Sequence, residues 1–422
     1  SVLRIRAMHV ASEQMALLDR ARALHERIIT FDSHIDIPLG FGGPGMRADE
    51  DGPGAFDLAK VERGRLSAAA LSIHAALARP GPESGAAGRE EHERRYKLIT
   101  NIAADFPERA RIVTSPEALR AAAREGCFAI VLSLQNAAPF EGLASLDLWH
   151  ERGVAMLDFA FIGNNRWSDS ARPYPFIGQG LHSGGLSALG KEAVERLNDL
   201  GIIIDVSQIS SEAVGDVVAR SSAPVIASHA APRAKVEVGR NLSDADMGRI
   251  AHGGGVVHVV GFAPYLLAPD AAMQARVREV WRRFGLAAPT SLADLMSVND
   301  PETTDWDDDR FLEFLHVFHD VLELDKPTAT VADYVDAIDY AVATIGVDHV
   351  GIGSDFNHGS GVRGWMTVGD NLNITAELLR RGYSEADIGR LWGENFLRAW
   401  RQVLDDARPH PSGAPLKSGH DR

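Results

Sequence analysis

The stretch FDSHID, residues 31–36, ends a short apolar run and places a histidine and an aspartate two residues apart. On a strand, His34 and Asp36 point to the same side, because successive side chains alternate between the two faces. An imidazole nitrogen and a carboxylate oxygen at one strand end can bind one divalent cation together. The same pair also occurs as an ordinary polar strand end, so its interpretation depends on what the rest of the chain places beside it.

Apolar runs like this one recur along the chain, and each is a predicted strand. Most of them lack strict alternation, which is typical of strands buried on both faces of a parallel sheet. The eight runs lie near residues 29–34, 67–74, 128–133, 154–160, 202–206, 224–228, 255–260 and 349–354.

Helical patterns separate the runs, and several begin with a serine that is suited to cap a helix N-terminus. The clearest are residues 115–124, 191–200, 210–220 and 243–251, with Ser115, Ser210 and Ser243 as expected caps. Repeated strand–helix alternation predicts an α/β fold with a parallel sheet. An open, doubly wound sheet is the alternative. We favour a (β/α)8 TIM barrel with extra helices, because no glycine-rich dinucleotide motif follows the first run and polar residues gather at the strand ends.

The length of the chain is compatible with one large domain. We expect residues 1–407 to form a single (β/α)8 barrel domain with a helical insertion around residues 266–345. The helices expected there are 272–284, 308–323 and 330–345. Residues 408–422 are rich in Pro, Gly, Ser and charge, and we expect a flexible C-terminal tail.

The charge balance and the single cysteine exclude some classes of function. The chain has 422 residues, with 43 basic and 58 acidic side chains and a net charge of −15. This disfavours nucleic acid or an anionic membrane as a partner. One cysteine, Cys127, excludes an intramolecular disulfide. With no secretory signal or long apolar stretch in the sequence, we expect a cytoplasmic protein, although the initial serine leaves open that a leader peptide was removed.

Two further strand ends carry residues that could join the first pair. His229 follows the run near 224–228, and Asp355 follows the run near 349–354. In a barrel, the C-terminal ends of all strands meet at one mouth. His34, Asp36, His229 and Asp355 are therefore expected to face one another, which predicts a metal site; the alternative is that each only satisfies a loop hydrogen bond.

Other polar residues are weaker candidates. His74 and His258 could face the mouth or be ordinary buried barrel histidines. Tyr265, just beyond the run near 255–260, could contact a ligand. We expect His358 to lie in a surface loop and Asp205 to be an internal or supporting carboxylate.

Taken together, five segments resemble the membrane dipeptidase family (renal dipeptidase, peptidase M19), a branch of the amidohydrolase superfamily. The resemblance extends over nearly the whole chain, and the segments that carry it are FDSHIDIP (31–38), GNNRWSDS (163–170), GLSALGKEAVERLNDLGIIIDVSQIS (185–210), PVIASHAAPRAKVEVGRNLSD (224–244) and HVGIGSDF (349–356). The resemblance implies a metal-dependent barrel that hydrolyses dipeptides, including those with a D-residue at the second position, on two zinc ions. It also implies a homodimer.

Position by position, the resemblance assigns roles to five residues. His34, Asp36 and His229 match metal ligands of the family. Asp355 matches a metal-site aspartate that also handles the proton of the attacking water. Arg240 matches the arginine that receives the substrate carboxylate.

Three positions depart from the family pattern. Gln135 stands where the family has a glutamate bridging both metals, and Gln208 stands where it has a metal-binding histidine. Phe161 replaces a histidine that contacts substrate. An amide is a poor zinc ligand and carries no charge to bridge two dications. We therefore expect one zinc ion rather than two, with none as an alternative.

The first hypothesis for function is a dipeptidase-like metallohydrolase of small amides or dipeptides with a free carboxylate. A repurposed relative with a degraded metal site, catalysing an isomerase, lyase or transferase type of reaction, is the second. A non-catalytic ligand-binding homologue is the third, and fold alone cannot separate them.

Overall fold

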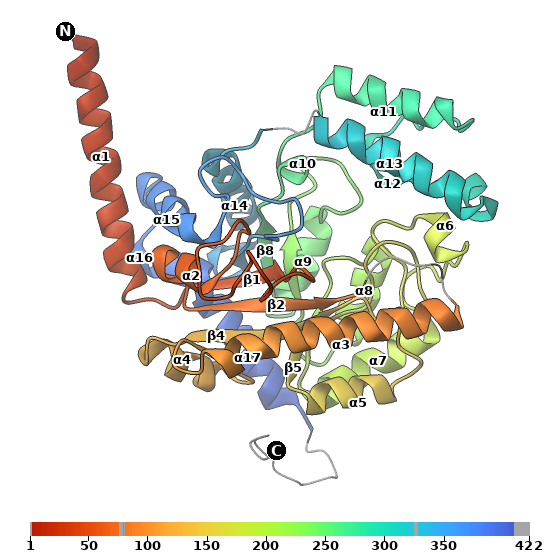
Figure 1. Cartoon of the computed structure of the whole chain (residues 1–422), viewed down its shortest axis with the longest axis horizontal. Coiled ribbons are helices and arrows are strands. Elements are labelled where there is room, and N and C mark those ends of the chain that lie inside the picture. Colours follow the sequence, from red (N-terminus) through yellow and green to blue (C-terminus); the bar gives the residue numbers. More distant parts are fainter. Residues whose placement is uncertain (1, 76–78, 80, 325–327, 409–422) are drawn as a thin grey trace.

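The computed structural model describes residues 2–75, 79, 81–324 and 328–408. Among them, parallel strands form the wall of a barrel, and helices surround it (Figure 1). The strands pair in the order β1-β2-β4-β5-β6-β7-β8-β9, and the short β3 pairs with β4 outside this path. The bounds are β1 Phe31–Asp36, β2 Ala68–His74, β3 Ala110–Ile112, β4 Phe128–Gln135, β5 Val154–Asp158, β6 Ile203–Asp205, β7 Ile226–Ala230, β8 Val256–Val260 and β9 Val350–Gly353.

The barrel closes where β9 meets β1. Ile35 forms a parallel bridge with Phe356, and the Asp36 amide donates to the Phe356 carbonyl at 3.0 Å. The Asp355 amide likewise donates to the His34 carbonyl at 3.0 Å. The predicted barrel is therefore confirmed, and the alternative of an open doubly wound sheet is wrong. Closure of the barrel brings together the two chain segments that carry His34, Asp36 and Asp355.

Helices follow most strands, and the predicted serine caps are confirmed. Ser115, Ser210 and Ser243 each accept a hydrogen bond from a backbone amide in the first turn of their helix. The helices are α1 Val2–His25, α2 Leu58–Gly64, α3 Pro82–Asp105, α4 Pro116–Arg124, α5 Ala144–Glu151, α6 Pro175–Gly178, α7 Ala188–Leu200, α8 Ser211–Arg220, α9 Asp244–His252, α10 Ala263–Leu266, α11 Ala271–Arg283, α12 Leu292–Ser297, η1 Pro301–Asp305, α13 Asp308–Leu324, α14 Val331–Ile345, η2 Val347–His349, η3 Val368–Asp370, α15 Asn371–Arg380, α16 Glu385–Gly389, η4 Arg390–Glu394 and α17 Asn395–Asp406.

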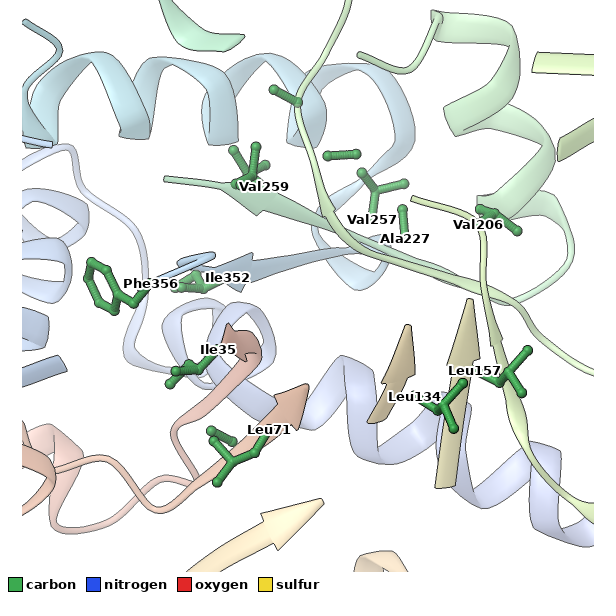
Figure 2. Close-up of a cluster of buried hydrophobic side chains, with 14 of the residues drawn as sticks. Ile35, Leu71, Leu134, Leu157, Val206, Ala227, Val257, Val259, Ile352 and Phe356 are labelled. Carbon is green, nitrogen blue, oxygen red and sulfur yellow. The ribbon is translucent and has the colours of Figure 1, made fainter. Parts of the chain in front are cut away.

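Strand alternation determines which side chains reach the barrel interior. Figure 2 shows apolar side chains from neighbouring strands that belong to one buried cluster, among them Ile35, Leu134, Leu157 and Val257. This cluster also contains buried side chains of the surrounding helices. Because neighbours on a strand face opposite sides, the residues beside these apolar ones turn inward. His34 and Asp36 flank Ile35 in this way.

A second buried cluster closes the other end of the barrel. It joins Phe31, Ala129 and Ile203, at or near the starts of their strands, to Phe396 and Trp400 of α17. The rings of Phe31 and Phe396 are stacked, with centroids 3.9 Å apart. The C-terminal helix thus seals the end of the barrel opposite the mouth.

A third buried cluster lies outside the barrel and holds the predicted insertion together. The helices predicted over 272–284 and 308–323 are α11 and α13, which Figure 1 shows as a layer beyond the barrel mouth. Trp281 of α11 meets Phe314 of α13 edge to face, and Phe311 of α13 stacks on Phe176 of α6. We call α11, α12, η1 and α13 the lid. The third predicted helix is α14, which packs against the barrel, and residues 409–422 of the expected tail lie outside the described residues.

Candidate metal centre and substrate pocket

Three ligand-bearing side chains meet where the barrel closes. Nε2 of His34 lies 3.3 Å from Oδ1 of Asp36 and 3.9 Å from Oδ1 of Asp355. All three residues are buried, and their ligand atoms lie within 4.8 Å of one another. Both ring nitrogens of His34 and Oδ1 of Asp36 are buried without a hydrogen-bond partner among the described residues. Buried polar atoms without partners are costly, so this donor set fits a cation of the zinc type.

The backbone at Asp355 is unusual for a residue with a side chain. Its φ is 60°, in the left-handed region that a non-glycine residue rarely adopts. The hydrogen bond from its amide to the His34 carbonyl holds the chain there. Strained conformations of this kind are found at functional sites, where the surrounding structure maintains them.

Two further histidines surround Asp36. Nδ1 of His74 lies 3.5 Å from Oδ1, and Nδ1 of His358 forms a 2.7 Å hydrogen bond with Oδ2. Burial would raise the pKa of Asp36, but the three imidazoles outweigh it and hold that pKa well below its usual range. His358 lies in an exposed loop, as predicted, and its ring in addition forms this hydrogen bond to the carboxylate, which the sequence did not predict.

His229 is hydrogen-bonded on both ring nitrogens. Nδ1 is 2.7 Å from the Ser228 hydroxyl, and Nε2 is 2.9 Å from Nε2 of Gln208. The Gln208 amide oxygen accepts from Arg240 at 2.8 Å and from Arg172 at 3.0 Å, so the amide NH2 group faces His229. The lone pair that a second cation would use is therefore engaged. Burial, together with the charges of His34 and Arg240, keeps the pKa of His229 well below its ordinary value.

Asp205 could complete a second cluster with His34 and His229. Its carboxylate is, however, surrounded by hydrogen-bond donors: the amides and hydroxyls of Ser207 and Ser228 all donate to it. These bonds position Ser228 beside His229. Asp205 thus supports the site, as predicted, and is already satisfied as an acceptor.

Gln135 is buried at the end of β4, in register with His74 of β2 and Asp158 of β5. Its position at the mouth is the one that strand order predicts. The side chain there is a neutral amide, so it adds no charge to the ligand cluster.

The three residues with predicted substrate roles lie around the ligands. The Arg240 guanidinium is buried, donates to the His229 carbonyl at 2.8 Å and lies 5.6 Å from the Tyr265 ring centre. The Phe161 ring is 5.5 Å from that of His358. The structure brings these side chains to the mouth, and their substrate roles stay predictions.

His258 is the predicted candidate that lies away from the mouth. Its ring contacts Phe31 and Phe396 in the sealed end of the barrel, and Nδ1 is 3.0 Å from the Ala227 carbonyl. Burial lowers the pKa of His258 to about 4, which keeps the ring neutral. It is an internal barrel histidine.

Sequence reasoning missed Arg172. It lies in the loop between β5 and α6, its guanidinium is 5.0 Å from the Phe161 ring centre, and it shares the Gln208 oxygen with Arg240. The only local signal was its place next to the Asn-rich segment, two residues beyond Ser170.

A closed parallel barrel with a buried cluster of histidine and aspartate ligands at its mouth has the architecture of a metal-dependent enzyme. A family model described as "Membrane dipeptidase (Peptidase family M19)" matches residues 18–412, and the chain belongs to this family. The chain is therefore a dipeptidase-like metallohydrolase that acts on small peptides.

Individual relatives agree with this family. The structure of the probable dipeptidase PvdM from Pseudomonas aeruginosa is similar with a TM-score of 0.89 and 47% identity, over 93% of this chain and 100% of that one. Dipeptidase tcpJ of Claviceps purpurea (strain 20.1) is 25% identical over 375 residues, which is 87% of this chain and 73% of that protein. A metallopeptidase named dipeptidase AC shares the fold, with a TM-score of 0.68 and 18% identity over 89% of this chain and 98% of that one.

Across the described residues, the helices are too short or too polar to cross a membrane.

Proposed function

We propose that the protein hydrolyses dipeptides or related small amides with a free carboxylate, using one zinc ion held by His34, Asp36 and Asp355. The observation that carries the proposal is this cluster of buried ligand atoms, with both His34 nitrogens and Asp36 Oδ1 lacking protein partners among the described residues. Nitrogen and oxygen ligands of this kind suit zinc. One ion is favoured over two because Gln208 engages the His229 lone pair and Gln135 supplies no bridging charge.

Lewis acidity is the chemistry that a divalent cation supplies at such a centre, for the substrate carbonyl and for the attacking water. Asp355 accepts the proton of that water and passes a proton to the leaving amine. Burial raises the pKa of Asp355, although the charges of His358 and His34 oppose this. Without a cation this carboxylate therefore holds a proton more tightly than an ordinary aspartate, and the charge of a bound zinc ion would lower its pKa again.

Arg240 binds the substrate carboxylate. Its Nη1 is buried and has no hydrogen-bond partner among the described residues, whereas Nε and Nη2 hold the side chain in place. A guanidinium fixed in this way can offer a directed donor to a carboxylate oxygen. The Tyr265 ring lies beside Arg240 and the Phe161 ring beside Arg172, and such rings suit the apolar part of a small substrate.

The test combines metal content with turnover. Protein purified without chelator is analysed for metals, loaded with zinc, and assayed on a panel of L,L- and L,D-dipeptides. We expect one zinc per chain and release of free amino acids. Asp355→Asn should lose about 10²-fold or more in kcat, whereas Asp348→Asn, at an exposed carboxylate in the η2 turn, should leave kcat unchanged.

Two results would contradict the proposal. Stable binding of two zinc ions would show that the glutamine positions still form a second site. Zinc-loaded protein that releases no product across the panel would exclude dipeptide hydrolysis and direct attention to a non-hydrolytic reaction or to ligand binding.

A further inference from the structure

Two arginines converge on one neutral oxygen at the barrel mouth. Oε1 of Gln208 accepts from Nε of Arg240 at 2.8 Å and from Nη2 of Arg172 at 3.0 Å. Neither arginine forms an ion pair with a carboxylate within the part of the chain that the structure describes. Two guanidinium groups thus share a single uncharged acceptor.

Each guanidinium retains an unused donor. Nη1 of Arg240 and Nε of Arg172 are both buried without a hydrogen-bond partner among the described residues. Arg240 as a whole is only 3% exposed. Buried charged donors without acceptors destabilise a protein unless a ligand satisfies them. The pocket therefore has capacity for more negative charge than one carboxylate at Arg240 requires.

The backbone fixes the second arginine in this position. The Ala171 amide donates to the Gln208 carbonyl at 2.8 Å, so the residue next to Arg172 is joined to the chain that carries the shared amide. Gly239, next to Arg240, packs so closely that a Cβ atom there would lie 2.7 Å from the Ala171 carbonyl oxygen. Contact between these two loops holds both guanidiniums at one place, whatever occupies it.

Neighbouring carboxyls do not balance this charge. Asp158 and Asp355 both influence Arg240 electrostatically, but within the described part of the chain neither carboxylate forms an ion pair with Arg240 or Arg172. Asp36 already has three imidazoles within 3.5 Å of its carboxylate oxygens. An anionic group brought by the substrate is the remaining source of compensation.

We propose that Arg172 is a specificity-determining residue that binds a second carboxylate, so that the preferred substrates are dipeptides or amides whose carboxylate-bearing residue has an acidic side chain. Arg240 takes the main-chain carboxylate, and Arg172 takes the side-chain carboxylate of aspartate or glutamate. The inference rests on the proposed function, because it assumes that the substrate carboxylate lies at Arg240.

The test uses binding and does not depend on turnover. N-acetylglutamate and N-acetylglutamine have nearly the same shape and differ by one negative charge, so the ratio of their affinities isolates the second carboxylate. Both enantiomers of each, with N-acetylaspartate as a shorter probe, are titrated into the full-length protein by calorimetry at constant ionic strength. We expect the wild type to bind the glutamate probe about 10- to 100-fold more tightly than the glutamine probe, as for a buried charge-assisted contact.

Variants of Arg172 then assign that preference. Arg172→Gln should remove the preference for N-acetylglutamate while leaving the affinity for N-acetylglutamine nearly unchanged. Arg172→Lys keeps the positive charge but lacks the planar guanidinium with its paired donors, so it should retain part of the preference. Arg166→Gln is the matched control, because Arg166 is an exposed arginine of the same loop, and it should keep the full ratio. Thermal melts confirm that each variant is folded.

The outcomes separate the two proposals. If N-acetylglutamine binds but the glutamate probe binds no more tightly, the inference about Arg172 fails and the proposed function stands. If Arg172→Gln weakens both probes equally, both arginines hold one carboxylate and the inference is overturned. If neither probe binds, the assignment of a substrate carboxylate to Arg240 fails, and the inference fails with it.

Discussion

Replacing Asp36 by asparagine removes the negative charge around which three imidazoles gather. The carboxylate accepts a 2.7 Å hydrogen bond from His358 and has His34 and His74 at 3.3 and 3.5 Å. Burial alone would lower the pKa of His358, but the hydrogen bond and charge of Asp36 raise it from 6.5 to about 9. In Asp36→Asn we expect this pKa to fall back toward its ordinary value.

The size of the effect follows from that shift. A change from 6.5 to about 9 corresponds to about 3 kcal/mol of preference for the charged imidazole, at about 1.4 kcal/mol per pKa unit. Because 40% of the His358 side chain is exposed, water screens part of the interaction. We therefore expect Asp36→Asn to remove about 1–2 kcal/mol of this preference, which lowers the pKa of His358 by about one unit.

The assay is a proton NMR titration of the His358 imidazole in chelator-treated protein, with His358→Gln used to assign the resonance. Asp348→Asn, at an exposed carboxylate, serves as the control and should leave the titration unchanged. If the pKa of His358 stays near 9 in Asp36→Asn, the charge of Asp36 is not its cause and the reasoning is refuted. The same variant should also bind zinc more weakly, because one proposed ligand is lost.

Three further predictions concern the metal count and the fold. The double substitution Gln135→Glu with Gln208→His should raise the zinc content from one to two per chain by elemental analysis; a content that stays at one would show that the pocket has diverged beyond these two positions. Gly190→Ala should lower stability by about 3 kcal/mol in thermal denaturation, because its Cβ would lie 2.1 Å from a backbone carbonyl oxygen. Gly215→Ala, where the added Cβ meets nothing within 4 Å, should not lower stability. Equal losses of stability in the two variants would show that the contact at Gly190 is not the cause. Burial lowers the pKa of His25 to about 4. As the pH falls below 6.5, the unfolded chain therefore protonates His25 before the folded chain does, and the free energy of unfolding should decline by up to about 3 kcal/mol toward pH 4. In His25→Gln this part of the pH dependence should be absent from urea unfolding curves.

The barrel could be predicted because its strands are buried on both faces. Such strands appear in the sequence as short apolar runs, and all eight predicted runs overlap a strand, as the one near 128–133 overlaps β4. β3 was not predicted because its three residues, Ala110–Ile112, are too few to form a recognisable run and lie outside the barrel path. Local sequence patterns therefore identify the strands of the barrel but not the short strand β3 that pairs with β4 outside it.

The ligand cluster could be predicted in part for a similar reason. His34 and Asp36 directly end a strand, and Asp355 follows one by two residues, so strand order alone brings them to the mouth. The inward turn of His358 depends on positive φ values at Asp355 and Asn357, 60° and 68°, which nothing in the residue types requires. Arg172 reaches its partner Gln208 across 36 residues of sequence, through loop contacts that no local pattern encodes.

The lid has a hydrophobic core separate from that of the barrel, and this core also includes Tyr174, two residues beyond Arg172. The cation ligands and the segment that carries Arg172 are therefore supported by different parts of the chain. The cation ligands are carried by the barrel wall, whereas Tyr174, near Arg172 in the sequence, packs among aromatic residues of helices outside the barrel. With the proposed role of Arg172, we therefore expect substitutions within the lid core to disturb the segment that selects the substrate more than the cation ligands, so that substrate choice and catalysis can change separately.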